Sequence, residues 1–178
     1  MKPKFTVVSR KIVFGKGPIR VLDCKIRLPS KRLISRQILD HPGSVVIIAR
    51  TAHNRYLMVR QFRFAAKRWL WEFPAGGVEK WESFKAAASR ELIEETGFRA
   101  GKMSKLMRFY PSPGISSECM HLFMASKLTP AYAKGDEDEE ISVGSFSPKQ
   151  IRRMIFDGEI IDAKTIAGFF CAQEFSNF

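Results

Sequence analysis

Short apolar runs, separated by glycine, proline and asparagine, dominate the pattern along this chain. Residues 44–50 read Ser-Val-Val-Ile-Ile-Ala-Arg, a continuous apolar run that is typical of a central strand buried on both faces. Shorter runs predict further strands at residues 5–9, 11–14, 20–27, 55–60, 119–125 and 141–146. A turn at residues 15–18, Gly-Lys-Gly-Pro, makes residues 4–28 a long antiparallel hairpin.

Helical spacing first appears at residues 83–96. Phe84, Ala88 and Leu92 recur at i, i+4 and i+8, so they share one face, which we expect to pack on a sheet. Ser83 is the expected N-cap, and Gly97 stands where a left-handed residue usually ends a helix.

Two more helices are expected near the end of the chain. Ser147 and Gln150 form a capping box with Pro148 at the first helical position. A last helix is expected to begin after Asp162. The apolar positions of these two helices are Ile151, Met154, Ile155, Ile166, Phe169 and Phe170. Strands and helices together predict a mixed sheet flanked by helices.

Three carboxylates crowd the end of the first helix, directly after a glycine-rich loop at residues 73–79. Glu91 and Glu95 share a face, with Glu94 beside them, and like charges this close repel one another. Hard divalent cations such as Mg²⁺ favour carboxylate oxygens and would remove that repulsion. Arg90, within reach of Glu82 and Glu94, is expected to hold the acidic face in place. The pattern predicts a metal site that handles phosphate; the alternative is a solvated acidic helix face.

The loop and the helix together match a longer pattern, Gly-x5-Glu-x7-Arg-Glu-hydrophobic-x-Glu-Glu-x-Gly-hydrophobic. Its fixed positions are Gly76, Glu82, Arg90, Glu91, Glu94, Glu95 and Gly97. This pattern is the Nudix box, and every fixed position is filled. The resemblance implies a metal-dependent hydrolase of nucleoside diphosphates linked to another moiety. It also implies an α/β fold (α+β), a Nudix-type α/β/α sandwich with a mixed sheet and an N-terminal antiparallel hairpin.

Neighbouring segments resemble one branch of that superfamily, the ADP-ribose pyrophosphatases and nucleoside diphosphate sugar hydrolases. They are residues 57–63, 71–76, 110–118, 136–141 and 158–165. A proline after the box, here Pro111 or Pro113, is a mark of ADP-ribose hydrolases. The resemblance runs from about residue 36 to residue 170. It implies cleavage of the pyrophosphate bond, giving a nucleoside monophosphate and a sugar phosphate.

The same resemblance implies roles for individual residues. Expected metal ligands are Ala75, through its carbonyl, with Glu91, Glu94, Glu95 and Glu139. Expected catalytic residues are Glu137, Glu139, Glu140 and Arg90, with the general base left open within the acidic run 136–140. Expected substrate-binding residues are Arg36, Arg60, Arg63, Gly76 and Glu118. Two or three Mg²⁺ ions, or Mn²⁺, are the expected cofactors. Solvated strand arginines and an exposed acidic loop are the alternatives.

Charge is unevenly distributed over the 178 residues, whose formal net charge is +12. Residues 1–70 carry 17 lysines and arginines against two acids, a net +15. This basic half could steer an anionic substrate toward the metal site, bind nucleic acid non-specifically, or be a solvated surface. Its cations are spread over strand-like segments, so specific nucleic-acid binding is not expected.

The length favours one Nudix domain over residues 1–178, with N-terminal strands at 1–40 and the core at 41–178. No apolar run is long enough to span a membrane, and no apolar signal core is present. Three scattered cysteines indicate a reducing, cytoplasmic setting, and three dispersed histidines argue against zinc.

Relatives in this branch commonly form homodimers through their N-terminal strands. The hairpin 4–28 fits that role, with Arg36 as a candidate to complete the partner's pocket. Alternatively, the hairpin covers its own sheet.

Two other functions stay open. One is a Nudix hydrolase of capped or 5′-triphosphate RNA, dinucleoside polyphosphates or damaged nucleotides. The other is a binding module without catalysis, although such modules usually lose box glutamates and here all are present.

Overall fold

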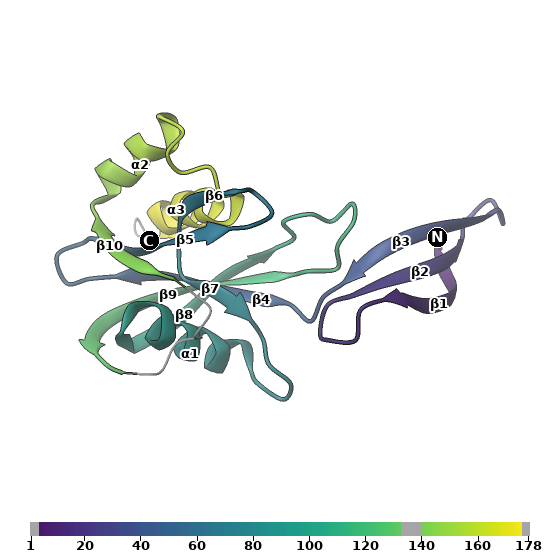
Figure 1. Cartoon of the computed structure of the whole chain (residues 1–178), viewed down its shortest axis with the longest axis horizontal. Coiled ribbons are helices and arrows are strands. Elements are labelled where there is room, and N and C mark those ends of the chain that lie inside the picture. Colours follow the sequence, from purple (N-terminus) through teal and green to yellow (C-terminus); the bar gives the residue numbers. More distant parts are fainter. Residues whose placement is uncertain (1–3, 133–139, 176–178) are drawn as a thin grey trace. The chain divides into compact units, whose positions relative to one another are not determined.

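The computed structural model describes residues 4–132 and 140–175 (Figure 1). These residues form two compact units. One contains the described residues up to Gly43 together with Tyr110–Cys119, and the other contains Ser44–Phe109 and the described residues from Met120 onward. The first boundary falls close to residue 40, where the N-terminal strands were expected to end.

The N-terminal unit is an antiparallel sheet. Its described strands are β1 (Thr6–Phe14), β2 (Arg20–Arg27) and β3 (Leu33–Asp40), in the order β1-β2-β3. The hairpin predicted for residues 4–28 is therefore present, whereas a strand at 33–40 was not expected. The segment Tyr110–Cys119 is joined to β3, since Leu39 donates its amide to Ile115 at 2.8 Å and accepts from Ser117 at 2.9 Å.

The second unit is built on a mixed sheet with the described strand order β10-β5-β4-β9-β8, with β6 on β5 and β7 on β4. The strand bounds are β4 (Ser44–Arg50), β5 (Tyr56–Arg63), β6 (Arg68–Glu72), β7 (Ala75–Gly77), β8 (Phe98–Phe109), β9 (Met120–Pro130) and β10 (Ser142–Phe146). Strands β4 and β9 run parallel, and the other pairs are antiparallel. Strands β6, β7 and β8 were not predicted from the sequence.

Helices cover both faces of this sheet (Figure 1). They are α1 (Phe84–Thr96) on one face, and α2 (Pro148–Phe156) and α3 (Ala163–Phe175) on the other. Alternate residues of β4 supply the two cores: Val45 and Ile47 pack with Leu92 of α1, whereas Val46 and Ile48 pack on the side of α2 and α3. The predicted sandwich with a mixed sheet is thus confirmed, and the continuous apolar run of β4 reflects burial on both faces.

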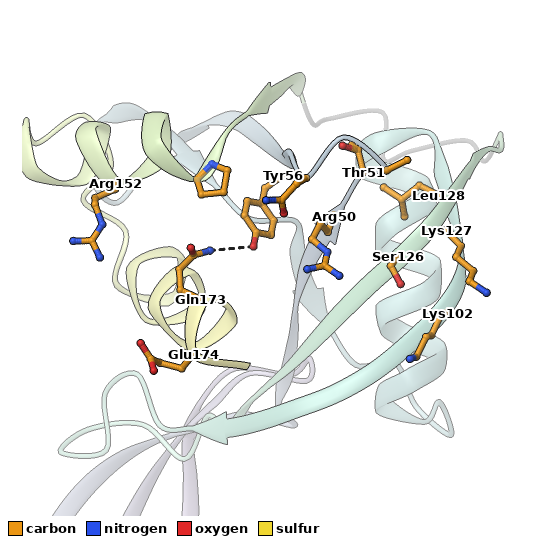
Figure 2. A pocket seen from close by; sticks show the side chains of 13 residues that line it. Arg50, Thr51, Tyr56, Lys102, Ser126, Lys127, Leu128, Arg152, Gln173 and Glu174 are labelled. Carbon is orange, nitrogen blue, oxygen red and sulfur yellow. Dashed lines mark hydrogen bonds between the residues drawn. The ribbon is translucent and has the colours of Figure 1, made fainter. Parts of the chain in front are cut away.

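The helix ends follow the predicted caps. The Ser83 hydroxyl accepts from the Ala86 amide, and Gly97 adopts φ 72° after the last turn of α1. Ser147 and Gln150 form the expected capping box at α2, with Pro148 at its first position. At the far end of α3, Gln173 donates to the Tyr56 hydroxyl at 3.1 Å and ties the helix to β5 (Figure 2).

Candidate active site

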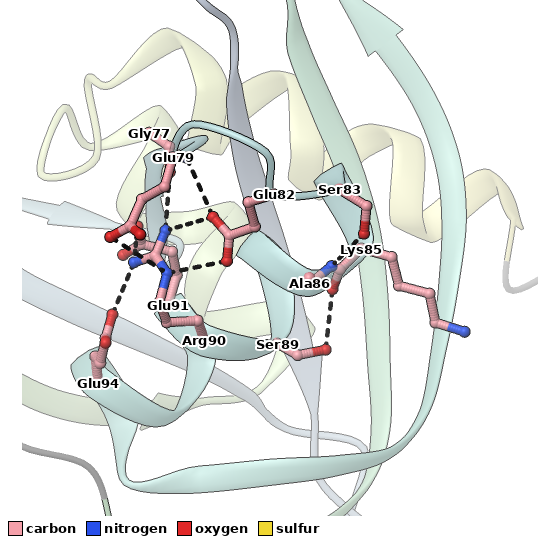
Figure 3. Close-up of polar contacts among 10 residues, drawn as sticks. All are labelled: Gly77, Glu79, Glu82, Ser83, Lys85, Ala86, Ser89, Arg90, Glu91 and Glu94. Atoms are coloured by element: carbon pink, nitrogen blue, oxygen red, sulfur yellow. Dashed lines mark hydrogen bonds and ion pairs between the residues drawn. The ribbon is translucent and has the colours of Figure 1, made fainter. Parts of the chain in front are cut away.

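Arg90 organises the acidic residues of α1 and of the loop before it (Figure 3). Its Nη1 donates to Glu91 Oε1 at 2.8 Å and to Glu94 Oε2 at 2.9 Å. Its Nε and Nη2 donate to the two oxygens of Glu82, each at 3.1 Å. Nη2 also donates to the Gly77 carbonyl at 3.0 Å. One guanidinium therefore gathers three carboxylates and the glycine-rich loop, as the helical spacing predicted for Glu82 and Glu94.

The glycine-rich loop packs directly against this helix. A Cβ on Gly76 would collide with the carboxylate of Glu91, so a larger residue there would displace this carboxylate from its present position. The next contact along the loop joins Ala75 to Glu95, whose Oε2 accepts the Ala75 amide at 3.0 Å. Glu95 is 7% exposed. The structure thus brings together Ala75, Gly76 and the two glutamates.

Electrostatics in this cluster are set by the excess of acids. The hydrogen bond with Glu82 and the negative charges of Glu91 and Glu94 raise the pKa of Arg90. In turn, the hydrogen bond from Arg90 lowers the pKa of the Glu82 carboxyl. Arg90 and Glu82 therefore stabilise each other's charged forms, and the carboxylate oxygens beside them are the kind of ligand that a divalent cation prefers.

A second ionic cluster lies beneath the loop, around Glu72 at the end of β6. Arg63 holds the Glu72 carboxylate with two hydrogen bonds, at 2.9 and 2.7 Å, and Lys164 of α3 pairs with the same carboxylate. Glu72 is 1% exposed. Burial acts to raise the pKa of Glu72, but the hydrogen bonds and charges of Arg63 and Lys164 outweigh it and lower the pKa.

This second cluster extends to the start of α3. Asp162 Oδ2 lies 3.0 Å from Lys164 Nζ and accepts from the Thr165 amide at 3.0 Å. The Thr165 hydroxyl accepts the Phe73 amide at 2.9 Å, so α3 is fastened to the strand that leads into the loop. Glu72 and residues 158–165 both lie within family-like segments, but no role was predicted for them. An acid inside the apolar run Trp-Leu-Trp-Glu-Phe was the available signal.

Two of the predicted residues meet at a separate pocket. Arg60 and Glu140 line a cavity of about 480 Å³ together with Trp69, Ile141 and Ser142. The Arg60 guanidinium lies 5.6 Å from the centre of the Trp69 ring, a cation–π arrangement. This pocket therefore combines a cation, an aromatic face and an acid from the predicted catalytic run.

The remaining predicted residues are distributed between the two units. Glu137 and Glu139 fall outside the described residues. Arg36, on β3, and Glu118, whose carboxylate lies 3.9 Å from His41, belong to the N-terminal unit. Their proposed roles toward substrate stay predictions. Within residues 4–132 and 140–175, no three His, Cys, Asp or Glu side chains are grouped closely enough to hold a metal ion by themselves.

Comparison with known proteins identifies the class. The model of the NUDIX domain family matches residues 40–169, so this chain belongs to the Nudix family. The match covers the mixed sheet, the glycine-rich loop, α1, α2 and the first part of α3. The prediction made from the seven fixed residues of the box is confirmed.

Individual relatives indicate the branch of the Nudix family to which this chain is most similar. The chain is 37% identical over 165 residues to the ADP-ribose pyrophosphatase of Bacillus subtilis, covering 90% of this chain and 87% of that protein. It is 34% identical to the GDP-mannose pyrophosphatase of Escherichia coli K12, covering 74% and 73%. A solved ADP compounds hydrolase has the same fold, with a TM-score of 0.85, 21% identity and 98% of this chain covered. The predicted branch, ADP-ribose pyrophosphatases and nucleoside diphosphate sugar hydrolases, is thereby confirmed. No helix of the described residues is long and apolar enough to cross a membrane.

Proposed function

We propose that this enzyme hydrolyses the pyrophosphate bond of ADP-ribose and related nucleoside diphosphate sugars, giving a nucleoside monophosphate and a sugar phosphate. The observation that carries the proposal is the arrangement of Glu91, Glu94 and Glu95 around Arg90 and the Gly76 loop. The names of the two relatives, ADP-ribose pyrophosphatase and GDP-mannose pyrophosphatase, support the same substrate class.

A divalent cation would be held by Glu91, Glu94 and Glu95, with the Ala75 carbonyl and Glu139 as further donors. The donor set fits a hard cation because it consists of oxygens. Magnesium commonly binds through one or two carboxylates together with waters and substrate phosphates. A Mg²⁺ ion that takes only one or two ligands from the protein does not need three carboxylates close together. Such coordination is consistent with the absence of a group of three metal-binding side chains among the described residues. Two or three Mg²⁺ ions, or Mn²⁺, would neutralise phosphate charge and lower the pKa of a bound water.

Arg90 is the positioning residue in this proposal. By holding Glu91 and Glu94 through one nitrogen, it fixes the direction of both carboxylates before the cation arrives. Gly76 lets the loop lie close to Glu91, because a larger residue at this position would displace the Glu91 carboxylate. Positioning and electrostatics carry the catalysis of such a reaction, since phosphoryl chemistry needs little covalent help from the protein.

The general base is proposed to come from the acidic run, among Glu137, Glu139 and Glu140. Glu140 shares its pocket with Arg60, which we favour over Arg63 as the residue that meets substrate. Both arginines were predicted to bind substrate, but Arg63 already donates two hydrogen bonds to the buried carboxylate of Glu72. Arg60 is exposed above the Trp69 ring and is suited to a phosphate or ribose oxygen.

The enzyme is proposed to act as a homodimer. All nine residues of β1 are exposed, although successive side chains of a strand point to opposite faces. Val8, Ile12 and Val13 are each close to half exposed, so β1 has apolar surface without a covering layer. A second copy of the chain would bury this surface, and Arg36 on β3 is the candidate to complete the partner's pocket.

Sedimentation equilibrium at micromolar concentration tests the dimer. The expected species has twice the chain mass of 20.3 kDa. Val8→Asp on β1 should shift the population toward the monomer. Lys11→Glu, on the same strand, is the matched control because it changes charge without removing apolar surface. A single 20.3 kDa species for the unmodified protein would reject the shared-site proposal.

We also propose a cytoplasmic setting. Cys24, Cys119 and Cys171 are free thiols, which is the usual state of cysteine in a reducing compartment.

Substrate choice is tested with a panel of ADP-ribose, ADP-glucose, GDP-mannose, diadenosine polyphosphate and triphosphate-ended RNA, each with Mg²⁺ and with EDTA. Product chromatography should show AMP and ribose 5-phosphate from ADP-ribose only when metal is present. Activity confined to RNA or polyphosphates would overturn the substrate class while leaving the family unchanged. Activity that survives EDTA would overturn the metal proposal.

A further inference from the structure

A large hollow lies at the end of the central strand β4 (Figure 2). The start of β4 pairs with the Gly76 loop, where Val45 is the partner of Gly76, whereas Arg50 at the end of β4 lines the hollow. Arg50 comes five positions after Val45 along β4, or about 17 Å at the usual rise. The hollow measures about 1010 Å³, at the upper end of the range for sites that bind small molecules.

Cations from four different elements surround it. Among the described residues that line the hollow, the charged ones are Arg50 of β4, Lys102 of β8, Lys127 of β9, Arg152 of α2 and Glu174 of α3. Figure 2 shows Arg152 on one side, the two lysines on the other and Arg50 between them. Four positive charges against one carboxylate make this an electropositive concavity, which concentrates anions.

Lys127 is held there by an unusual backbone. Its φ of 55° lies in the left-handed region, which a residue with a Cβ rarely adopts. In a regular strand, Lys127 would point to the face opposite from Ser126 and Leu128. Instead, all three consecutive residues line the hollow. The left-handed lysine thus adds its charge to a face that strand alternation would otherwise deny it.

The neighbouring strand makes room for this conformation. Gly101 of β8 lies opposite, between the paired positions Ala100↔Leu128 and Lys102↔Ser126. A Cβ on Gly101 would lie 3.0 Å from Lys127 Cβ and 3.2 Å from its carbonyl oxygen, which is too close for an ordinary contact. Backbone strain of this kind is concentrated at functional sites, where the surrounding structure enforces it.

The rest of the lining suits a small organic anion. Thr51, Asn54, Ser126 and Gln173 offer hydroxyl and amide groups, and Leu128 and Pro148 offer apolar surface. Gln173 is already fixed by its hydrogen bond to Tyr56 (Figure 2). A concave site with several cations and an apolar portion favours a phosphorylated metabolite over a bare ion.

We propose that this hollow is a second ligand site, separate from the glutamate-rich end, that binds a small molecule carrying two or more phosphate groups. The inference stands on the lining residues and the Lys127 backbone, and it does not depend on which nucleotide the enzyme hydrolyses.

Calorimetric titration of the full chain with inorganic tripolyphosphate tests the site. EDTA is present throughout, so that binding through a metal at the glutamates is excluded. Saturable binding that weakens as salt is added is expected. Lys127→Asn should raise Kd about tenfold, as expected for loss of a charge-assisted contact. Asparagine tolerates the left-handed conformation, so the thermal midpoint should be unchanged or raised.

Lys67→Asn is the matched control. Lys67 has nearly the same left-handed backbone, φ 53°, and lies in the turn between β5 and β6, outside the hollow. It should bind tripolyphosphate as the unmodified protein does. Arg152→Gln, which removes a cation from a different element, should weaken binding as Lys127→Asn does. If Lys67→Asn and Lys127→Asn lost tripolyphosphate affinity equally, the loss would come from the lower net charge of the protein. That outcome would overturn the proposed site.

Hydrolysis separates this proposal from the active site. Lys127→Asn should cleave ADP-ribose with unchanged kcat/KM. A loss of kcat/KM that matches the loss of tripolyphosphate binding would assign the hollow to the substrate and overturn a second site. A single-stranded oligonucleotide that binds through Lys127 far more tightly than tripolyphosphate does would overturn the small-molecule ligand in favour of nucleic acid.

Discussion

The two ionic clusters of this protein differ in how acids and cations are balanced. Around Arg90, one guanidinium serves Glu82, Glu91 and Glu94 among the described residues, so acids are in excess. Around Glu72, by contrast, two cations, Arg63 and Lys164, face two carboxylates, Glu72 and Asp162. An unbalanced, partly exposed cluster is poised to accept a cation. A balanced, buried one cannot accept a charge and instead fastens β6 and α3 together.

The largest effect expected from this contrast is on catalysis. Glu95→Gln keeps the acceptor for the Ala75 amide but removes the negative charge that a cation needs. We expect kcat for ADP-ribose to fall about 10³-fold, equivalent to roughly 4 kcal/mol of barrier, with little change in unfolding free energy. Steady-state kinetics with Mg²⁺ and thermal unfolding measure the two quantities.

Glu159→Gln is the matched control, because Glu159 is an exposed acid between α2 and α3. It should leave both quantities unchanged. Turnover of Glu95→Gln at the level of the unmodified enzyme would remove Glu95 from the metal site.

The second largest expected effect is a loss of stability when the Glu72 cluster is disrupted. Glu72→Gln would leave Arg63 and Lys164 with Asp162 as the one carboxylate among the described residues of the cluster, which should lower the free energy of unfolding by about 3 kcal/mol. Because the folded-state pKa of Glu72 is lowered, its contribution is present above the unfolded pKa, about 4.3. That contribution is lost as pH falls through the lower folded-state pKa.

Denaturant titrations from pH 7 to pH 3 check this assignment. The gap between the two proteins should be constant near neutrality and should narrow below about pH 4.3. A gap that stays constant across the whole range would show that Glu72 stabilises the fold without its charge.

The sequence predicts most of the contacts in the Arg90 cluster but few of those in the Glu72 cluster. Arg90, Glu91 and Glu94 are neighbours on one helix, so helical spacing alone placed them together. Glu72, Arg63 and Lys164 come from three elements, and their meeting depends on how α3 crosses the sheet. The same limit applies to β8, whose glycine and four lysines and arginines conceal its strand pattern, and to the cations of the hollow at Arg50, which four elements bring together.

A third expected effect follows from the excess of negative charge around Arg90. Arg90→Gln leaves Glu91 and Glu94 without their shared cation, so we expect a loss of about 2 kcal/mol in unfolding free energy. Arg90 is 26% exposed, so solvent screening limits the loss to less than that of a fully buried pair. Added Mg²⁺ should raise the thermal midpoint of the variant more than that of the unmodified enzyme, because the ion then supplies the missing positive charge.

Arg152→Gln serves as the comparison, since it removes a cation far from the glutamates. Its midpoint should respond to Mg²⁺ as that of the unmodified enzyme does. An equal response of Arg90→Gln would mean that the acidic cluster does not take up the ion.

The smallest effect separates two acids that both face Arg90. Glu82 is 15% exposed and accepts two hydrogen bonds from the guanidinium, whereas Glu79 is 72% exposed and lies 4.0 Å away. Glu82→Gln should cost about 1 kcal/mol at pH 7, because a charged hydrogen-bond partner is lost. Glu79→Gln should cost less than about 0.5 kcal/mol, as is usual for an exposed pair. Since Arg90 lowers the pKa of Glu82, the larger cost should disappear in acid, below about pH 4.3. Equal costs for the two variants would mean that proximity to Arg90, rather than hydrogen bonding to it, stabilises the cluster.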